Sequence, residues 1–422
     1  MNNNPEKLHI LISAYACRPN EGSEPGISWN LVPELLQYHH IWLLTRENNR
    51  KVIEAALQTH PIPGLNIVYS DIPSYLRWLK PSQKSVHIHY YLWQIAAYLY
   101  AKKLHRDIKF DLIHHLTYVR YWSPSFLSLL PIPFLWGPVG GGESAPGAFW
   151  SDFSLRGKFY EVMRNLARTL SELDPFVQIT AKRSVLARAT TEDTAKCLKR
   201  LGAKKIEVVS QLGLLDGEIS HLSQYSLAAN YPVRFISIGR LLHWKGFHLG
   251  LRAFAQANLP GDVEYWIVGD GAEKAQLLAL VEELGIGNRV KFWNHRSRQE
   301  TLEILSQASI LVHPSLHESG GQVCLEAMAT GRPVICLDLG GPATQVTPQT
   351  GIKVHAINPE QAVADLAAAM AKLATDAQLR SQMGEAGKNR VKDLYNWNAK
   401  AKSLAQLYTE IVSKELQQVI IK

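Results

Sequence analysis

The stretch from Ala308 to Cys336 constrains the fold of this 422-residue chain more than any other. It begins with an apolar run that ends in His-Pro-Ser, and it continues through Glu318-Ser-Gly-Gly into a helical pattern over Val323–Thr330. A second apolar run follows Gly331 and Pro333, which are residues that end helices. The order strand, loop, helix, strand predicts a unit of a parallel sheet. Glu318 would then lie at the carboxyl end of a strand, where doubly wound α/β proteins bind ligands.

The same alternation occurs in two sets, which predicts two α/β domains of about 200 residues each. Strands of the first set are expected at Leu8–Ala14, His40–Leu44, Asn66–Tyr69, Leu112–His114, Pro133–Trp136 and Ile206–Ser210. Strands of the second set begin near Val233, Val263, Arg289, Ile310 and Pro333. We expect the first domain over residues 1–215, a linker over 216–231 where the periodicity is lost, the second domain over 232–395, and an amphipathic helix within 396–422.

Composition narrows the class of protein. The chain is 46% hydrophobic and 19% charged, which is typical of folded globular proteins. No apolar stretch is long enough to span a bilayer, and the run Leu8–Ala14 is too short for a signal sequence, so we expect a cytoplasmic protein. The four cysteines have neither zinc nor redox spacing and are expected to be reduced.

The net charge of +8 favours an anionic partner. A nucleotide diphosphate, a phospholipid surface and a nucleic acid are the three candidates. Because the chain carries no helix-turn-helix, zinc-finger or RNA-binding aromatic pattern, we expect no nucleic acid partner.

Glu318 and Glu326 form the first motif. Seven residues separate them, and Gly320-Gly321 follows the first acid. Glu326 would lie about two turns into the next helix, so both carboxylates could face one crevice, although such pairs also occur on the surfaces of ordinary helices. The arrangement resembles the Glu-x7-Glu motif of glycosyltransferase family 4. That family consists of retaining sugar transferases with two Rossmann-like, doubly wound domains facing a central cleft, the GT-B type.

A second motif, Gly239-Arg240-Leu-Leu-His-Trp-Lys245-Gly, follows the first strand of the second set. It resembles the family's Gly-Arg-Leu-x3-Lys-Gly motif, whose arginine and lysine hold the diphosphate of the donor. A departing diphosphate gains negative charge, which two fixed cations would stabilise. Arg240 and Lys245 could instead be ordinary solvated loop residues.

The resemblance implies a role for each remaining candidate. Glu326 would accept hydrogen bonds from the ribose hydroxyls, and Glu318 would orient the donor sugar. Other donor-binding candidates are Gly22, Gly26, Ser319, Gly320, Gly321 and Gln322. Either His114 or His115 would contact the sugar from the first domain, and the carboxyl-terminal helix would cross back onto that domain. A plain turn at Gly22–Gly26 and hydrogen-bonded structural histidines are the alternatives.

The implied reaction moves a hexose from a nucleotide diphosphate sugar to a hydroxyl of a lipid, a lipid-linked glycan or a polysaccharide, with retention of configuration. The donor is a co-substrate, and the leaving phosphate would take the acceptor proton. Because no Asp-x-Asp and no zinc spacing occurs, we expect no metal and no other cofactor. The alternatives are a GT-B nucleotide-sugar epimerase and a non-catalytic nucleotide-sugar-binding scaffold. The hexose, the nucleotide, the acceptor and the oligomeric state stay open.

A basic amphipathic pattern covers residues 155–170. Its apolar residues at helical spacing are Phe159, Val162, Met163, Leu166 and Leu170, and its basic residues are Arg156, Lys158, Arg164 and Arg168. An aromatic-rich stretch that includes Tyr75 and Trp78 precedes it. This pattern fits a helix that lies on the inner face of an anionic membrane, but it also fits a helix whose apolar stripe packs on the sheet.

Overall fold

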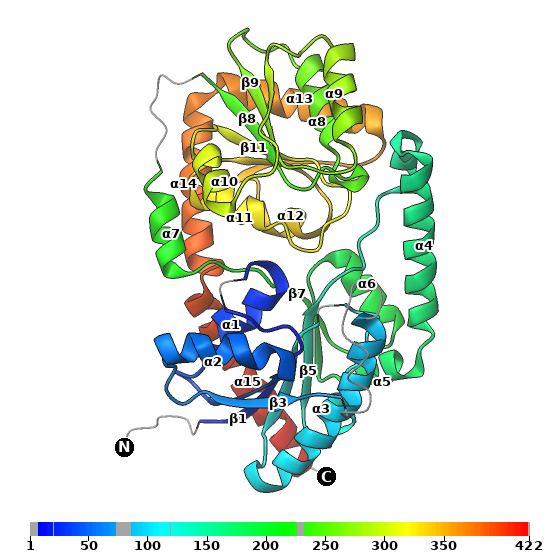
Figure 1. Ribbon diagram of the computed structural model, residues 1–422, viewed down its shortest axis with the longest axis vertical. Coiled ribbons are helices and arrows are strands. Elements are labelled where there is room, and N and C mark those ends of the chain that lie inside the picture. The colour runs from blue at the N-terminus through cyan, green and yellow to red at the C-terminus, as the bar shows by residue number, and fades with distance from the viewer. Residues whose placement is uncertain (1–6, 20, 73–85, 119, 226–231, 421–422) are drawn as a thin grey trace. The chain divides into compact units, whose positions relative to one another are not determined.

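The computed structural model describes residues 7–19, 21–72, 86–118, 120–225 and 232–420, so the aromatic positions Tyr75 and Trp78 lie outside the described residues. The chain forms two compact units (Figure 1). Unit 1 comprises Met1–Gly142, Ala167–Gly213 and Trp397–Lys422. Unit 2 comprises Glu143–Leu166 and Leu214–Asn396.

Unit 1 is built on a parallel sheet of strand order β3-β2-β1-β4-β5-β6-β7. Its strands are β1 His9–Ala14, β2 His40–Arg46, β3 Asn66–Ser70, β4 Leu112–Thr117, β5 Phe134–Val139, β6 Leu186–Ala189 and β7 Ile206–Val208. All six predicted strands are present. Strand β6 was missed because its sequence, Leu-Ala-Arg-Ala, is short and has no run of large apolar side chains.

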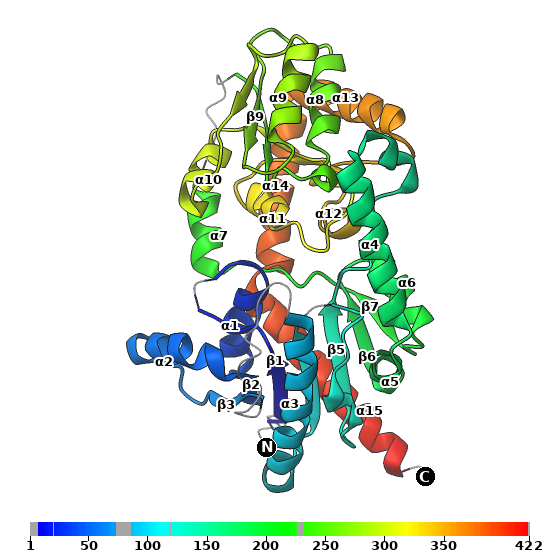
Figure 2. The same cartoon turned by 45° about the vertical axis from the view of Figure 1, so that its right-hand side comes forward.

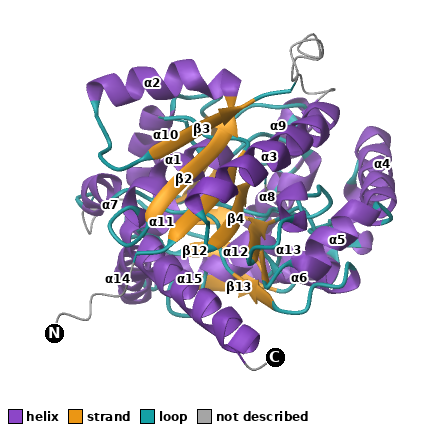
Figure 3. Cartoon of the chain, turned by 90° about the horizontal axis from the view of Figure 1, so that it is seen from below, coloured by secondary structure: helices purple, strands orange, loops and turns teal. Residues whose placement is uncertain are grey.

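Helices cover both faces of this sheet (Figure 3). They are α1 Ser23–Leu35, α2 Arg50–Thr59, α3 Val86–Ile108, α5 Pro175–Arg183, α6 Glu192–Arg200 and α15 Trp397–Ile420, with the single turns η1 Glu47–Asn49 and η3 Phe126–Leu129. Successive strand side chains point to opposite faces. Ile10 and Ile12 pack with α1 and α15, whereas Leu11 packs with α3, α5 and α6. The carboxyl-terminal helix α15 therefore belongs to the core of unit 1.

Unit 2 has a second parallel sheet of order β10-β9-β8-β11-β12-β13. Its strands are β8 Arg234–Ile238, β9 Glu264–Val268, β10 Val290–Phe292, β11 Ile310–His313, β12 Val334–Leu337 and β13 Gly351–Val354. Its helices are α7 Asp216–Ser223, α8 Phe247–Gln256, α9 Lys274–Glu283, α10 Arg298–Ser306, α11 Gln322–Ala329, α12 Gly340–Gln345, α13 Pro359–Thr375 and α14 Ala377–Leu394, with the short turns η4 Gly147–Asp152 and η5 His243–Lys245.

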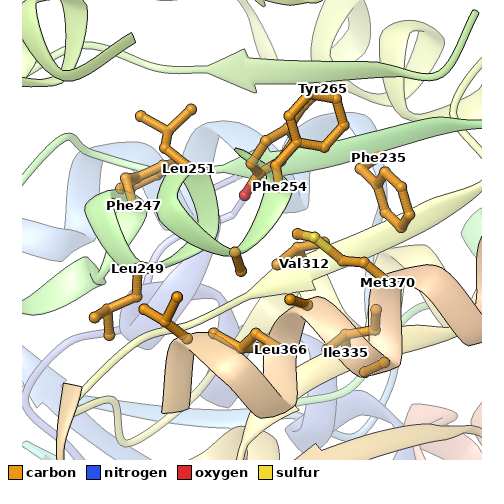
Figure 4. Close-up of a cluster of buried hydrophobic side chains, with 14 of the residues drawn as sticks. Phe235, Phe247, Leu249, Leu251, Phe254, Tyr265, Val312, Ile335, Leu366 and Met370 are labelled. Atoms are coloured by element: carbon orange, nitrogen blue, oxygen red, sulfur yellow. The ribbon is translucent and has the colours of Figure 1, made fainter. Parts of the chain in front are cut away.

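Helices α8, α9 and α13 lie beside one another (Figure 2) and close one face of this sheet. Phe254 of α8 and Leu366 and Met370 of α13 meet Val312 and Ile335 of the strands in one apolar cluster (Figure 4). All five side chains are fully buried. Burial of each large apolar side chain stabilises the fold by roughly 1.5–3 kcal/mol. This packing holds the sheet in place beneath its loops.

Two boundaries differ from the sequence-based expectation. Residues 216–223, expected to belong to a linker, form helix α7, and residues 226–231 lie outside the described part of the chain. The helix forms because Ile219 and Leu222, three positions apart, are both buried and because the Glu218 carboxylate accepts a hydrogen bond from Leu215 N at 2.9 Å. In addition, residues 143–166, expected in the first domain, belong to unit 2.

Helix α4, Leu155–Glu172, begins within this segment of unit 2, and its residues from Ala167 onward belong to unit 1. Among the described residues no helix is both long enough and apolar enough to span a membrane.

Candidate active site

Two loops of unit 2 meet because their strands are neighbours. Strands β8 and β11 pair in parallel, so the loops after their carboxyl ends lie on the same edge of the sheet. The first loop carries Arg240 and Lys245, and the second carries Glu318. Gly246 lets them approach, since its φ is +67° and a Cβ there would collide with the carbonyl of Pro314.

Lys245, His313 and Glu318 form the centre of this site. Lys245 Nζ lies 2.5 Å from Glu318 Oε2, and His313 Nε2 lies 3.0 Å from the same oxygen. Burial alone would raise the pKa of Glu318, but the charge of Lys245 and the His313 hydrogen bond outweigh it and hold that pKa well below its usual range. Glu318 is therefore ionised and is not suited to act as a general acid. The sequence interpretation did not include His313.

The backbone of the Glu318 loop rests on the start of α12. Gly341 N donates to Glu318 O at 2.7 Å, and Gln345 Nε2 donates to Gly320 O at 2.9 Å. Gly321, with φ of +92°, is the residue from which α11 begins. The loop is therefore held by fixed hydrogen bonds and presents the amino end of α11 directly after Glu318. Ser319 Oγ donates to Glu143 Oε2 at 2.5 Å, and Glu143 is a further residue that the motifs did not indicate.

Glu326 lies on α11, as predicted, and it is only 8% exposed. Arg298 Nη2 donates to Glu326 Oε1 at 3.0 Å, and Arg298 Nη1 donates to Glu218 Oε1 at 2.8 Å. Burial raises the pKa of Glu326 and the Arg298 charge opposes this rise. Arg298 was missed because an arginine at the start of a helix in a polar stretch gives no sequence signal.

The other predicted residues of unit 2 are accessible. Arg240 is exposed on the loop after β8, and Gln322 is half-buried at the first position of α11. Structure and sequence thus agree on the loops that carry Arg240, Lys245, Glu318, Ser319, Gly320, Gly321, Gln322 and Glu326. Their roles toward a donor stay predictions.

The two candidate histidines of unit 1 are buried in β4. His114 Nε2 lies 2.5 Å from Gly137 O and His114 Nδ1 lies 2.6 Å from the Tyr408 hydroxyl of α15. Because a carbonyl only accepts, Nε2 donates and Nδ1 accepts. Burial lowers the pKa of His114 to about 3 and that of His115 to about 4, and His115 Nε2 lies 3.3 Å from Tyr118 O. These contacts favour the structural alternative for His114.

Gly22 and Gly26 occupy different positions in the first loop. Gly22 caps the amino end of α1 and has open space where a side chain would be. Gly26 lies within the first turn, where a Cβ would collide with the carbonyl of Glu21. Packing therefore explains Gly26, whereas nothing in the local packing requires glycine at position 22.

The two units define the fold before any relative is considered. Two Rossmann-like units, each with a parallel sheet covered by helices, are the domains of a GT-B fold. Solved structures share this fold. Sucrose-phosphate synthase from Thermosynechococcus elongatus superposes with a TM-score of 0.64 at 20% identity, covering 97% of this chain and 100% of that one. HepE from Anabaena in complex with UDP superposes with a TM-score of 0.60 at 18% identity, covering 96% and 100%.

The family signal lies in unit 2. Residues 223–390 match the family model described as Glycosyl transferases group 1. D-inositol 3-phosphate glycosyltransferase of Corynebacterium jeikeium is 35% identical over 183 residues, 41% of this chain and 42% of that protein. The lipopolysaccharide core biosynthesis glycosyltransferase LpsE of Rhizobium meliloti is 34% identical over 162 residues, 38% and 44%.

The chain thus spans less than half the length of these curated relatives. The match of residues 223–390 to the group 1 glycosyltransferase model confirms the resemblance drawn from the two motifs.

Proposed function

We propose that this protein is a retaining hexosyltransferase that moves a hexose from a nucleotide diphosphate sugar to a hydroxyl of a lipid, a lipid-linked glycan or a polysaccharide. The observation that carries the proposal is the contact of Lys245 with Glu318 at 2.5 Å, inside the matched glycosyltransferase domain. It unites the two loops that the sequence motifs assigned to the diphosphate and to the sugar. UDP in the HepE complex supports a nucleotide-linked donor.

The charges of the site suit a departing diphosphate. Lys245 has three N–H donors, and its contact with Glu318 uses one, which leaves two for phosphate oxygens. Arg240, exposed on the same loop, would supply the second cation. Because the negative charge of the diphosphate grows as the glycosidic bond breaks, both cations would stabilise the transition state more than the bound donor. Glu318 and the backbone of Gly320-Gly321 would orient the sugar.

Glu326 would bind the ribose. Its buried carboxylate is held by Arg298, so it is oriented before the nucleoside arrives. The leaving phosphate would take the proton of the acceptor hydroxyl on the face it departs from. No step then requires a general base from Glu318 or a metal ion, and we expect activity to survive a chelator.

A panel of nucleotide sugars, tested first for thermal stabilisation and then as radiolabelled donors with and without acceptor extracts, tests the proposal. Transfer of label to an acceptor supports it, and NMR of the new linkage establishes whether the configuration is retained. An epimer formed without acceptor would identify the epimerase instead. Binding with neither product would identify a scaffold, and a strict need for manganese or magnesium would contradict the metal-free mechanism.

The exposed apolar side chains of helix α4 support the proposal that the acceptor is located at a membrane. Its apolar stripe does not pack on a sheet, because Phe159, Met163 and Leu166 are 67%, 46% and 49% exposed. This exposure favours the membrane alternative over the one in which the stripe covers the sheet. Two of the basic residues of the pattern contact the backbone of the protein, since Arg164 Nη2 donates to Glu143 O and Arg168 Nη2 donates to Gly142 O.

We infer that an anionic lipid surface covers this stripe. Both carboxylates of α4 point away from it, because Glu161 is buried and Glu172 accepts hydrogen bonds from Tyr121 and Arg200. Arg156 is exposed beside the apolar side chains, and the chain carries a net charge of +8. An outer face with apolar side chains, a cation and no carboxylate is suited to the interface of an anionic bilayer.

Sedimentation with phosphatidylglycerol vesicles at low and high salt tests this contact. The parent and the control Ile357→Gln, a change at an exposed apolar residue outside α4, should bind at low salt and release at high salt. The double variant Phe159→Gln/Leu166→Gln should bind less at both. No binding of the parent at low salt would favour a soluble acceptor, and loss of self-association in the double variant would identify a second copy as the partner.

A further inference from the structure

The inward side of α4 carries a charge where an ordinary helix would carry an apolar residue. Of the described side chains of this helix, the buried positions are Gly157 and Glu161, and Glu161 is 0% exposed. A carboxylate removed from water is costly unless it is hydrogen-bonded and paired. Its partners therefore indicate why it is there.

Arg164 of the same helix forms an ion pair with Glu161 at 3.8 Å, and the two hydrogen-bond partners of Glu161 come from the two loops of the candidate active site. His243 Nε2 and His317 Nε2 each lie 3.1 Å from Glu161 Oε1. His243 is two residues before Lys245 in the chain, and His317 directly precedes Glu318. One carboxylate of α4 thus joins the loop of the phosphate-binding lysine to the loop of the sugar-orienting glutamate.

Packing around the carboxylate holds the two histidines in place. Gly157, one turn before Glu161, lets His243 approach α4, since a Cβ at position 157 would lie 3.2 Å from the His243 ring. The Trp244 ring stacks on the rings of Tyr160 and His317, with centroid distances of 5.2 Å and 5.1 Å. The contacts between α4 and the loops are therefore both polar and aromatic.

Electrostatics agree with this geometry. Burial would raise the pKa of Glu161, but the hydrogen bonds from His243 and His317 outweigh it and lower that pKa to about 2. The carboxylate is ionised at neutral pH and can accept from both imidazoles. Neither histidine is free to change its ring orientation without breaking a charge-assisted hydrogen bond.

We propose that Glu161 is a positioning residue of the donor site, which acts through His243 and His317 to hold Lys245 and Glu318 at the distance that the transfer needs. The expected effect of Glu161 on the reaction rate rests on the proposed function. Loop positioning itself does not depend on that function. Displacement of a catalytic group by about 1 Å can lower a rate by about a hundredfold.

The test compares two carboxylates of the same helix. Glu161→Gln keeps the size of the side chain and one acceptor oxygen but removes the charge. Glu172→Gln is the matched control, because Glu172 is also held by partners, Tyr121 OH at 2.6 Å and Arg200 Nη2 at 2.8 Å, but belongs to unit 1. Glu161→Gln should lower kcat by about tenfold to a hundredfold with an unchanged acceptor KM. Glu172→Gln should keep kcat within twofold of the parent, and Glu161→Ala should lose more than Glu161→Gln.

Hydrogen exchange provides a readout that does not need turnover. Lys245 N donates to Leu242 O at 2.9 Å and Leu316 N donates to Trp244 O at 2.8 Å, so both loops contain amides whose protection can be followed. In Glu161→Gln, peptides covering residues 240–246 and 314–319 should exchange faster than in the parent and in Glu172→Gln.

Unchanged exchange in both loops would overturn the inference, as would a kcat for Glu161→Gln equal to that of Glu172→Gln in an active enzyme. If the parent transfers no sugar but the two loops exchange faster in Glu161→Gln, the proposed function fails and the positioning of the loops by Glu161 is still supported.

Discussion

Strands β4 and β11 occupy equivalent places in the two sheets, each beside the first strand of its unit, yet their histidines differ in kind. His313 is the last residue of β11, whereas β4 continues past the predicted end at His114 to Thr117, so His114 lies within the strand. His313 at the end of β11 meets the ionised Glu318, which also contacts Lys245. His114 in β4 meets the Tyr408 hydroxyl and the Gly137 carbonyl, which are both neutral. One histidine is part of a charged cluster on a loop edge and the other is part of a core.

This difference shows that a place on a central strand of a parallel sheet is not enough to put a histidine in a binding site. A group that binds an anionic ligand needs charged neighbours and access, as the partly exposed Lys245 and Glu318 have. A group whose polar atoms are all bonded inside the core stabilises the fold instead. We expect four measurable consequences of this difference between the loop residues and the core histidine, given in order of decreasing effect.

Lys245→Ala should lower turnover by about 10²–10³, or about 2.7–4 kcal/mol in the barrier, by comparison with the loss of one donor to a developing oxyanion. Donor affinity should fall much less, because the charge on the diphosphate grows only as the bond breaks. Steady-state kinetics and calorimetry with the nucleotide diphosphate measure the two effects. A turnover within twofold of the parent would remove Lys245 from the site.

His114→Phe should destabilise unit 1 while leaving nucleotide affinity unchanged. The phenyl ring fills a similar volume but leaves Gly137 O and the Tyr408 hydroxyl without their partner, at about 1–3 kcal/mol for each buried group. Urea unfolding and calorimetry with UDP measure stability and affinity. A stable variant that no longer transfers sugar would show that His114 contacts the donor after all.

Glu326→Ala should weaken binding of the nucleotide diphosphate by about 1.5–3 kcal/mol, the value of a hydrogen bond to a charged group. Turnover at saturating donor should change little, since the ribose is remote from the reacting carbon. Calorimetry with UDP against the deoxyribose analogue separates the ribose contact from the phosphate contacts. Equal affinity of parent and variant would exclude Glu326 from the site.

Acid should destabilise the parent more than His114→Phe. The folded state lowers the pKa of His114 from an ordinary value of 6.5 to about 3, so below pH 6.5 the unfolded chain binds a proton that the folded chain does not. Stability is therefore lost as the pH falls from 6.5 toward 3. The slope of unfolding free energy against pH should be steeper in the parent by up to about 1.4 kcal/mol per pH unit. Equal slopes between pH 6.5 and 4.5 would mean that His114 titrates normally.

The two-sheet architecture and the loops that carry the candidate site could be predicted from the sequence alone. Apolar runs of three to seven residues separated by helical patterns and glycines are local signals, and each predicted strand formed at the expected place. Lys245 and Glu318 could be predicted to lie close together because both motifs follow strands, and parallel strands bring their carboxyl ends to one edge. Glu326 lies on the helix that follows, as predicted, and its role stays a prediction.

The side-chain partners of these residues could be identified only from the tertiary structure. Arg298 joins Glu326 from another helix, and Glu161 reaches His317 across 156 positions of sequence, which no local period can indicate. The amphipathic pattern of α4 was visible, but whether its apolar stripe faces a sheet or the outside depends on the partners of Glu161 and Arg164. Burial is a property of the assembled neighbours, because a side chain is removed from water only by residues that folding brings to it.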